Sequence, residues 1–278
     1  MRNRVAFRNG GRGRLRHAAI LLLACVAATP GTAVAENGPN PLAGDYFVGA
    51  SVFLFERTVL AAFAPAGSTD MTLDAGAVAL AGEGADDESG SAAMEALVGW
   101  IDAWLGAKPT GTAGAVPEGF GAGRRRALAC LIYGADPLTH GEVAQRAGLG
   151  GEDRKDCVAR YQDAAKKWTA WLLPFRKLPG APVPVRAAPE GAPFEGEPVL
   201  RLAFAPALDD ADQAIADAMQ KNGLFQVLTD GLNATLAMPR PMTALLTQCG
   251  EPKAFYNADR GEAVLCYELL AELLKAAP

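Results

Sequence analysis

The chain has 278 residues, half of them hydrophobic, and a formal net charge of −5. Its first 35 residues contain six Arg and no acidic residue, so the remainder has 20 basic and 31 acidic residues and a charge of −11. Such an acidic chain argues against nucleic acid or an anionic lipid surface as its partner. The remaining residues, about 240 of them, suffice for one large domain or two small ones.

The N-terminal stretch predicts export. An Arg-rich segment at 1–16 precedes an apolar segment at 18–28, and small residues follow at 33–35, where a signal peptidase would cleave. We therefore interpret residues 1–35 as a cleaved signal peptide and expect a periplasmic or extracellular protein that begins at Glu36.

Two further features concern the membrane. Leu22-Leu23-Ala24-Cys25 resembles a lipobox, so lipidation at Cys25 is the alternative to simple cleavage. The longest later apolar run, at 46–65, is interrupted by Glu56 and Arg57. We therefore expect no membrane insertion after signal cleavage.

Four cysteines remain after residue 35. An even number in an oxidising compartment predicts two disulfides, and we favour the local pairs Cys130–Cys157 and Cys249–Cys266. Each such bond contributes about 3 kcal/mol in the chain-entropy description. The alternative is a zinc site made of all four thiolates, although the chain has no CxxC spacing.

Residues 36–177 read as a helical block. A helix predicted at 46–63 is apolar nearly all round, which places it in the centre of a domain and makes its two charges, Glu56 and Arg57, the unusual residues. Residues 64–91, which include the acidic run at 83–88, are predicted to be a solvated loop. Further helices are expected at 91–106, 124–133, 138–147 and 152–173, with His140 as a surface residue at a helix start.

The Pro-rich segment 178–198 predicts a linker to an α+β block at 199–278. This second block has strand patterns at 199–204 and 242–248, with a helical region at 210–229 that breaks near Asn222-Gly223. It ends in a hairpin closed by the Cys249–Cys266 pair and a final helix at 267–275.

The hairpin region carries a family resemblance. Cys249-Gly250-Glu251, Ala254-Phe255-Tyr256 and Cys266-Tyr267-Glu268-Leu269 resemble CGEANAFYDP and CYEL, motifs of a family of exported putative metallopeptidases. In that family an HExxH zinc helix follows these motifs. Residues 127–137, ALACLIYGADP, resemble the later family motif CLLYGSDP, and residues 47–63 resemble the zinc helix itself.

The resemblance covers nearly all of residues 36–278, but with the two halves in reversed order. It therefore implies a circular permutation in which the segment 178–198 joins the ancestral ends. The implied fold is a helix-rich α+β, zincin-like domain with a small antiparallel sheet. Residues 36–278 would then form one domain, as a monomer or a domain-swapped dimer.

The zinc chemistry of the family is not matched. A zincin needs two imidazoles one helical turn apart and a Glu beside them, whereas this chain has Phe55-Glu56-Arg57-Thr58-Val59 there and no histidine. The resemblance thus implies that zinc, the family's cofactor, has no ligands here. Glu56 is the candidate catalytic residue, or else it forms a buried pair with an arginine among 124–126.

We interpret the chain as an exported metallopeptidase-like protein with a degenerate zinc site, non-catalytic, that binds a peptide or protein or regulates one. The residues expected to line the remnant cleft are Phe55, Arg57, Val59, Phe255 and Tyr256. The competing interpretation is an active metal-dependent peptidase or hydrolase that uses Glu56, the carboxylates at 83–88 and a different ion. A structural relic with no ligand is the third.

Overall fold

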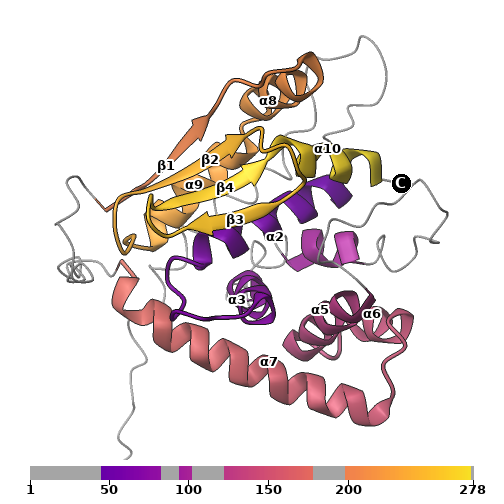
Figure 1. Cartoon of the computed structure of the whole chain (residues 1–278). Helices are drawn as coiled ribbons and strands as arrows, with labels where there is room; N and C mark the ends of the chain where they lie inside the picture. Colours follow the sequence, from indigo (N-terminus) through magenta and orange to yellow (C-terminus); the bar gives the residue numbers. More distant parts are fainter. Residues whose placement is uncertain (1–44, 83–93, 102–121, 178–197, 277–278) are drawn as a thin grey trace, which may run out of the picture.

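A computed structural model describes residues 45–82, 94–101, 122–177 and 198–276. Across these ranges the chain is a helix-rich α+β protein with a mixed four-stranded sheet (Figure 1). The expected signal peptide with Cys25, the carboxylates at 83–88 and the expected linker up to residue 197 lie outside the described residues. No helix in the described ranges is both long enough and apolar enough to span a bilayer.

The helical block contains a series of helices that pack on one another. In chain order they are α2 (Asp45–Leu60), α3 (Asp70–Gly82), a helix at 94–101, α5 (Ala122–Ala135), α6 (Gly141–Arg146), α7 (Gly151–Leu172) and the short 3-10 helix η2 (Leu173–Phe175). Except for α3 and η2, each lies within or close to a predicted helix, with bounds that differ by a few residues.

The prediction of a solvated loop at 64–91 is wrong for α3, whose second half is buried. The small Ala and Gly side chains of this helix allow α7 to approach closely. A Cβ at Gly76 would collide with the indole of Trp168, and the Trp168 Nε1 donates to the carbonyl of Thr72 at 2.9 Å. Tertiary packing against a large aromatic side chain therefore overrides the loop-like composition of the segment.

The α+β block follows the predicted order closely. Its elements are β1 (Leu200–Phe204), α8 (Asp210–Asn222), α9 (Leu224–Thr235), β2 (Met242–Thr247), β3 (Ala254–Asn257), β4 (Glu262–Cys266) and α10 (Tyr267–Ala276). The predicted break between the two helices is at Gly223, whose φ of 75° suits a residue without a Cβ. The predicted hairpin and the helix after it are confirmed.

The sheet has the order β1-β2-β4-β3 and is mixed rather than antiparallel as expected. Strands β1, β2 and β4 are parallel, and only β3 runs antiparallel to its neighbour β4. The reason is that α8 and α9 return the chain to the same end of the sheet before β2 begins. The hairpin then places β3 outside β4 as an edge strand, so β4 pairs with β2 in the parallel sense.

One face of the sheet carries the core residues. The register puts on this inner face the side chains of Leu200, Leu202, Phe204, Met242, Ala244, Leu246, Ala254, Tyr256, Ala263 and Leu265, all part of the main core or packed against it. Helices α2, α9 and α10 contact these strands. The opposite face carries Phe255, which is 38 % exposed.

Helix α2 lies between the sheet and the other helices of the first block (Figure 1). Phe55 contacts Phe225 of α9 with ring centroids 5.5 Å apart, and Phe53 contacts Trp100 at 5.1 Å. Helix α10, at the far end of the chain, also contacts α2. The two sequence blocks therefore share one continuous hydrophobic core, with α2 at its centre.

Candidate functional site

Two disulfides are present, and both predicted pairs are confirmed. Cys130–Cys157 joins α5 to α7 with Cα atoms 5.0 Å apart, and Cys249–Cys266 joins the loop after β2 to the end of β4 with Cα atoms 5.5 Å apart. Because the bonds use all four thiols, the alternative zinc site made of four thiolates is ruled out.

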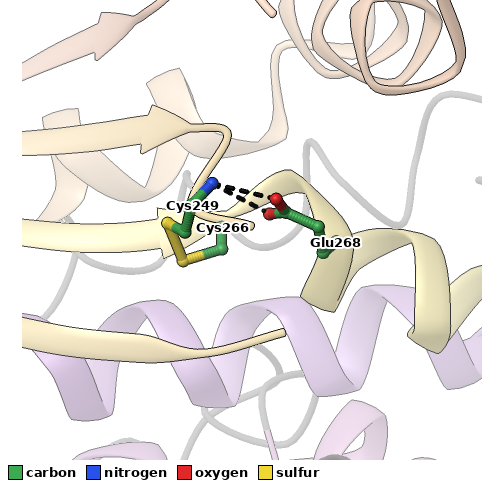
Figure 2. A group of neighbouring side chains, drawn as sticks. All are labelled: Cys249, Cys266 and Glu268. Atoms are coloured by element: carbon green, nitrogen blue, oxygen red, sulfur yellow. Dashed lines mark hydrogen bonds between the residues drawn. A yellow bond between two sulfur atoms is a disulfide. The ribbon is translucent and has the colours of Figure 1, made fainter. Parts of the chain in front are cut away.

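Glu268 lies beside the second disulfide at the start of α10 (Figure 2). Its carboxylate accepts the backbone N–H of Cys249 at 2.9 and 3.2 Å and also that of Gly250. Gly250 has a φ of 79°, a conformation that suits glycine and brings two successive N–H groups toward one carboxylate. We call this arrangement the Glu268 clamp; it fixes the loop that precedes β3 to the start of α10.

The strongest polar network of the described residues involves Arg57. This residue is 6 % exposed, and its guanidinium donates from Nε to Asp74 at 2.6 Å and from Nη2 to Asp70. Asp74 is completely buried in α3 and also accepts two hydrogen bonds from Arg124 of α5, one of them at 2.6 Å. One buried carboxylate thus joins α2, α3 and α5, and together Asp70 and Asp74 balance the charges of Arg57 and Arg124.

The sequence did not single out Asp74. Its signal is the spacing of Asp70 and Asp74, four residues apart and hence on one side of a helix. That spacing carries information only once the segment is known to be helical, and the Gly- and Ala-rich composition predicted a loop. Arg57, by contrast, was expected near a cleft, and the structure gives it a buried structural role.

The side chain of Glu56 leaves α2 on a different face from that of Arg57. Consecutive residues of a helix are about 100° apart, so Glu56 shares a face with Gly49 and Phe53, the face that packs on residues 96–100. Its carboxylate makes no hydrogen bond or ion pair with any described residue. The predicted pairing with an arginine at 124–126 is therefore wrong, and Arg124 binds Asp74 instead.

The environment of Glu56 favours its neutral form. Burial raises the pKa of its carboxyl group from 4.5 to about 8, because the charged form is poorly solvated inside the protein. A carboxyl group with such a pKa holds a proton at neutral pH. It is thus chemically able to donate or accept a proton there, which an ordinary surface glutamate does not do.

The structure does not bring the five expected cleft residues to one surface. Phe55 and Val59 are completely buried in the core, and Arg57 is bound to Asp70 and Asp74. On β3, Tyr256 faces α2 while Phe255 points to the opposite face of the sheet, where Lys253 lies over its ring at 4.9 Å. Of the expected cleft, only the β3 strand, which carries Phe255 and Tyr256, remains at a surface of the protein.

Strand β3 is the antiparallel edge of the sheet. The N–H of Cys266 donates to the carbonyl of Lys253, so residues 253, 255 and 257 direct their backbone polar groups toward β4. Ala254 and Tyr256 therefore direct their N–H and C=O groups outward. No described residue forms a hydrogen bond with these outward groups.

The donor atoms near α2 do not fit a zinc ion. The segment that resembles an HExxH helix supplies the carboxylate of Glu56 and no imidazole. His140, the one histidine after residue 35, precedes α6, which packs against α5, and is only 8 % exposed, so its prediction as a surface residue is wrong. The sulfurs of Cys249 and Cys266, which lie near Glu268, are bonded to each other.

Comparison with known proteins gives one match. Residues 204–277, which run from the end of β1 into α10, match the model of a family described as "Putative metallopeptidase". The matched segment includes β3, both cysteines of the Cys249–Cys266 bond and Glu268, whereas α2 lies outside it. No curated protein and no solved structure matches the chain.

The Asp74 network predicts a large effect on stability. Replacing Asp74 with Asn removes a buried carboxylate that binds both Arg57 and Arg124 and leaves Arg57 with the weaker, exposed partner Asp70, which destabilises the fold by about 3–5 kcal/mol. The control is Asp70→Asn, because the Asp70 side chain is 71 % exposed and its pair with Arg57 contributes at most about 1 kcal/mol. Urea unfolding under oxidising conditions measures the free energy of unfolding of each variant. Equal losses of stability in the two variants would contradict the structural role of Asp74.

The raised pKa of Glu56 predicts a pH-dependent stability. Between about pH 4.5 and 8 the carboxyl ionises in the unfolded chain but stays protonated in the native protein, so its ionisation favours unfolding increasingly as the pH rises. Glu56→Gln removes this effect. We expect the stability difference between variant and wild type to grow in favour of the variant across this window, by up to a few kcal/mol at pH 9. Parallel stability curves from pH 4 to 9 would refute the shifted pKa.

Proposed function

We propose, from the match of residues 204–277 to a metallopeptidase family model, that the chain is an exported metallopeptidase-like protein whose zinc site is degenerate. In this proposal it has no catalytic activity and binds an extended segment of a peptide or protein along β3. The scaffold is zincin-like, with α2 in the position of the zinc helix beneath the sheet.

The observation that carries the proposal is the open backbone edge of β3, a strand within the segment that matches the family model. At the β1 edge, the side-chain amide of Asn233 binds the outward N–H and C=O of Leu200 at 2.9 and 2.7 Å, whereas no described residue binds those of Leu202 and Phe204. At the β3 edge, the outward groups of Ala254 and Tyr256 have no partner among the described residues. An extended chain can add to such an edge through backbone hydrogen bonds without a pocket of defined shape.

Two observations support the absence of catalysis. The helix that resembles a zinc helix offers no imidazole, and carboxylates alone bind zinc poorly and do not readily generate hydroxide at neutral pH. In addition, Arg57 in the same helix is committed to Asp70 and Asp74. The segment therefore serves the packing of α2 against α3, which in turn binds α5 through Asp74.

The contact between α10 and α2 supports the permuted order of the halves. In the family the CYEL motif precedes the zinc helix in sequence, whereas here α10 follows Cys266 and α2 lies near the other end of the chain. The two helices nevertheless lie against each other. Export is supported by the N-terminal sequence pattern and by the two disulfides, which are typical of oxidising compartments.

A hydrolase is the second candidate, and the state of Glu56 favours it. A carboxyl group that has a pKa of about 8 and no hydrogen-bond or ion-pair partner among the described residues is suited to proton transfer at neutral pH. In that case Glu56→Gln would abolish hydrolysis of peptide substrates without unfolding the protein. The carboxylates at 83–88, which this candidate also uses, lie outside the described residues.

Strand addition at β3 predicts that a proline will block binding. Ala254→Pro removes an outward N–H that takes no part in the pairing with β4, so the sheet tolerates it. A linear peptide selected from a displayed random library should bind the wild type and lose about tenfold or more in affinity on this variant, with Ala254→Ser, which keeps the N–H, as the matched control. A library without binders, or a binder unaffected by the proline, would contradict the proposal.

The degenerate site predicts a protein without a stoichiometric transition metal. We expect elemental mass spectrometry of the mature, oxidised protein to find less than one zinc per chain, because α2 provides no imidazole. Addition of excess zinc should leave the melting temperature unchanged. Stoichiometric zinc retained through gentle purification, together with peptide hydrolysis that Glu56→Gln abolishes, would favour the hydrolase.

A further inference from the structure

The two disulfides differ in their accessibility. Cys130 and Cys157 are both buried, and together with Ala144 and Leu149 they form a small hydrophobic cluster between α5, α6 and α7. In the second bond Cys266 is completely buried, but Cys249 is partly exposed, because it lies on the loop between β2 and β3. Cys249 is therefore the most exposed of the four bonded cysteines.

The position of Cys266 makes it a good leaving group. It immediately precedes the first residue of α10, a helix of ten residues whose unpaired N–H groups and dipole stabilise a thiolate at that end. A carboxylate oxygen of Glu268 lies within 4.8 Å of the Cys266 sulfur and would repel a thiolate there. The Glu268 clamp offsets this repulsion, since that carboxylate accepts the N–H groups of Cys249 and Gly250.

We propose that Cys249–Cys266 is a thiol–disulfide exchange site that accepts a dithiol reductant, whereas Cys130–Cys157 is a purely structural bond. A thiolate of the reductant attacks the Sγ of Cys249, the bond between the two sulfurs breaks, and Cys266 leaves as the thiolate. The second thiol of the reductant then attacks its own sulfur in the mixed disulfide and releases Cys249. The reductant departs as a cyclic disulfide, so two electrons and two protons pass to the protein.

Exchange at this site loosens the start of β3. The disulfide is the covalent link between the β2–β3 loop and the end of β4, next to the hydrogen bond from Cys266 N–H to the carbonyl of Lys253. Without the bond, residues 249–253 are held by the Glu268 clamp and by this hydrogen bond. The site is therefore defined by its own chemistry and stands independently of any ligand that binds at β3.

Selective reduction of the native wild-type protein tests the proposal. Dithiothreitol is added under non-denaturing conditions, free thiols are trapped with iodoacetamide at intervals, and the modified cysteines are mapped by mass spectrometry. We expect Cys249 and Cys266 to be alkylated at least about tenfold faster than Cys130 and Cys157, which are the internal control, while circular dichroism shows that the fold persists. Equal rates for the two bonds, or reduction only on global unfolding, would overturn the proposal.

The attacked sulfur is identified with a monothiol. A short exposure to glutathione, followed by the same alkylating quench, captures the mixed disulfide before it resolves. Glutathione on Cys249 with the alkyl group on Cys266 is the expected product. Glutathione mainly on Cys266, or shared equally between the two, would refute the assignment of Cys266 as the leaving thiolate.

Discussion

The burial of α2 on all its sides is the constraint on which the rest of the structure depends. A helix that is apolar nearly all round is stable in water only if every face is covered. The sheet with α9 and α10 covers one side, and α3 with the helix at 94–101 covers the other. Neither sequence block could bury this helix alone, which explains why the two blocks share one core.

The same constraint explains the different fates of two neighbouring charges. Arg57 points toward α3, where it binds Asp70 and the buried Asp74, and Asp74 also binds Arg124 of α5. Glu56 points toward the helix at 94–101, has no partner within the part of the chain that the structure describes, and keeps its proton at neutral pH. A buried ionisable group is either paired or neutral, and α2 contains one example of each solution.

Features that depend on local patterns could be predicted from the sequence. The hairpin, the short-range disulfides, the break at Gly223 and the central position of α2 all follow from nearby residue types and spacing. The burial of α3 could not be predicted, because it depends on Trp168, which is far away in sequence. The parallel pairing of β2 with β4 could not be predicted either, because it depends on where the β3–β4 hairpin docks. The pairing of Arg124 with Asp74 depends on residues 70–82 being helical.

The order of the elements along the chain has a consequence for folding. Helix α2 comes early, but β4 and α10, which cover it, come about 200 residues later. The entropic cost of closing a loop rises only slowly with its length, so the separation costs little stability. Contacts between residues so far apart in sequence nevertheless slow folding considerably. A growing chain thus presents α2, which is apolar nearly all round, long before β4 and α10 exist to cover it, so the chain needs protection from aggregation until they arrive.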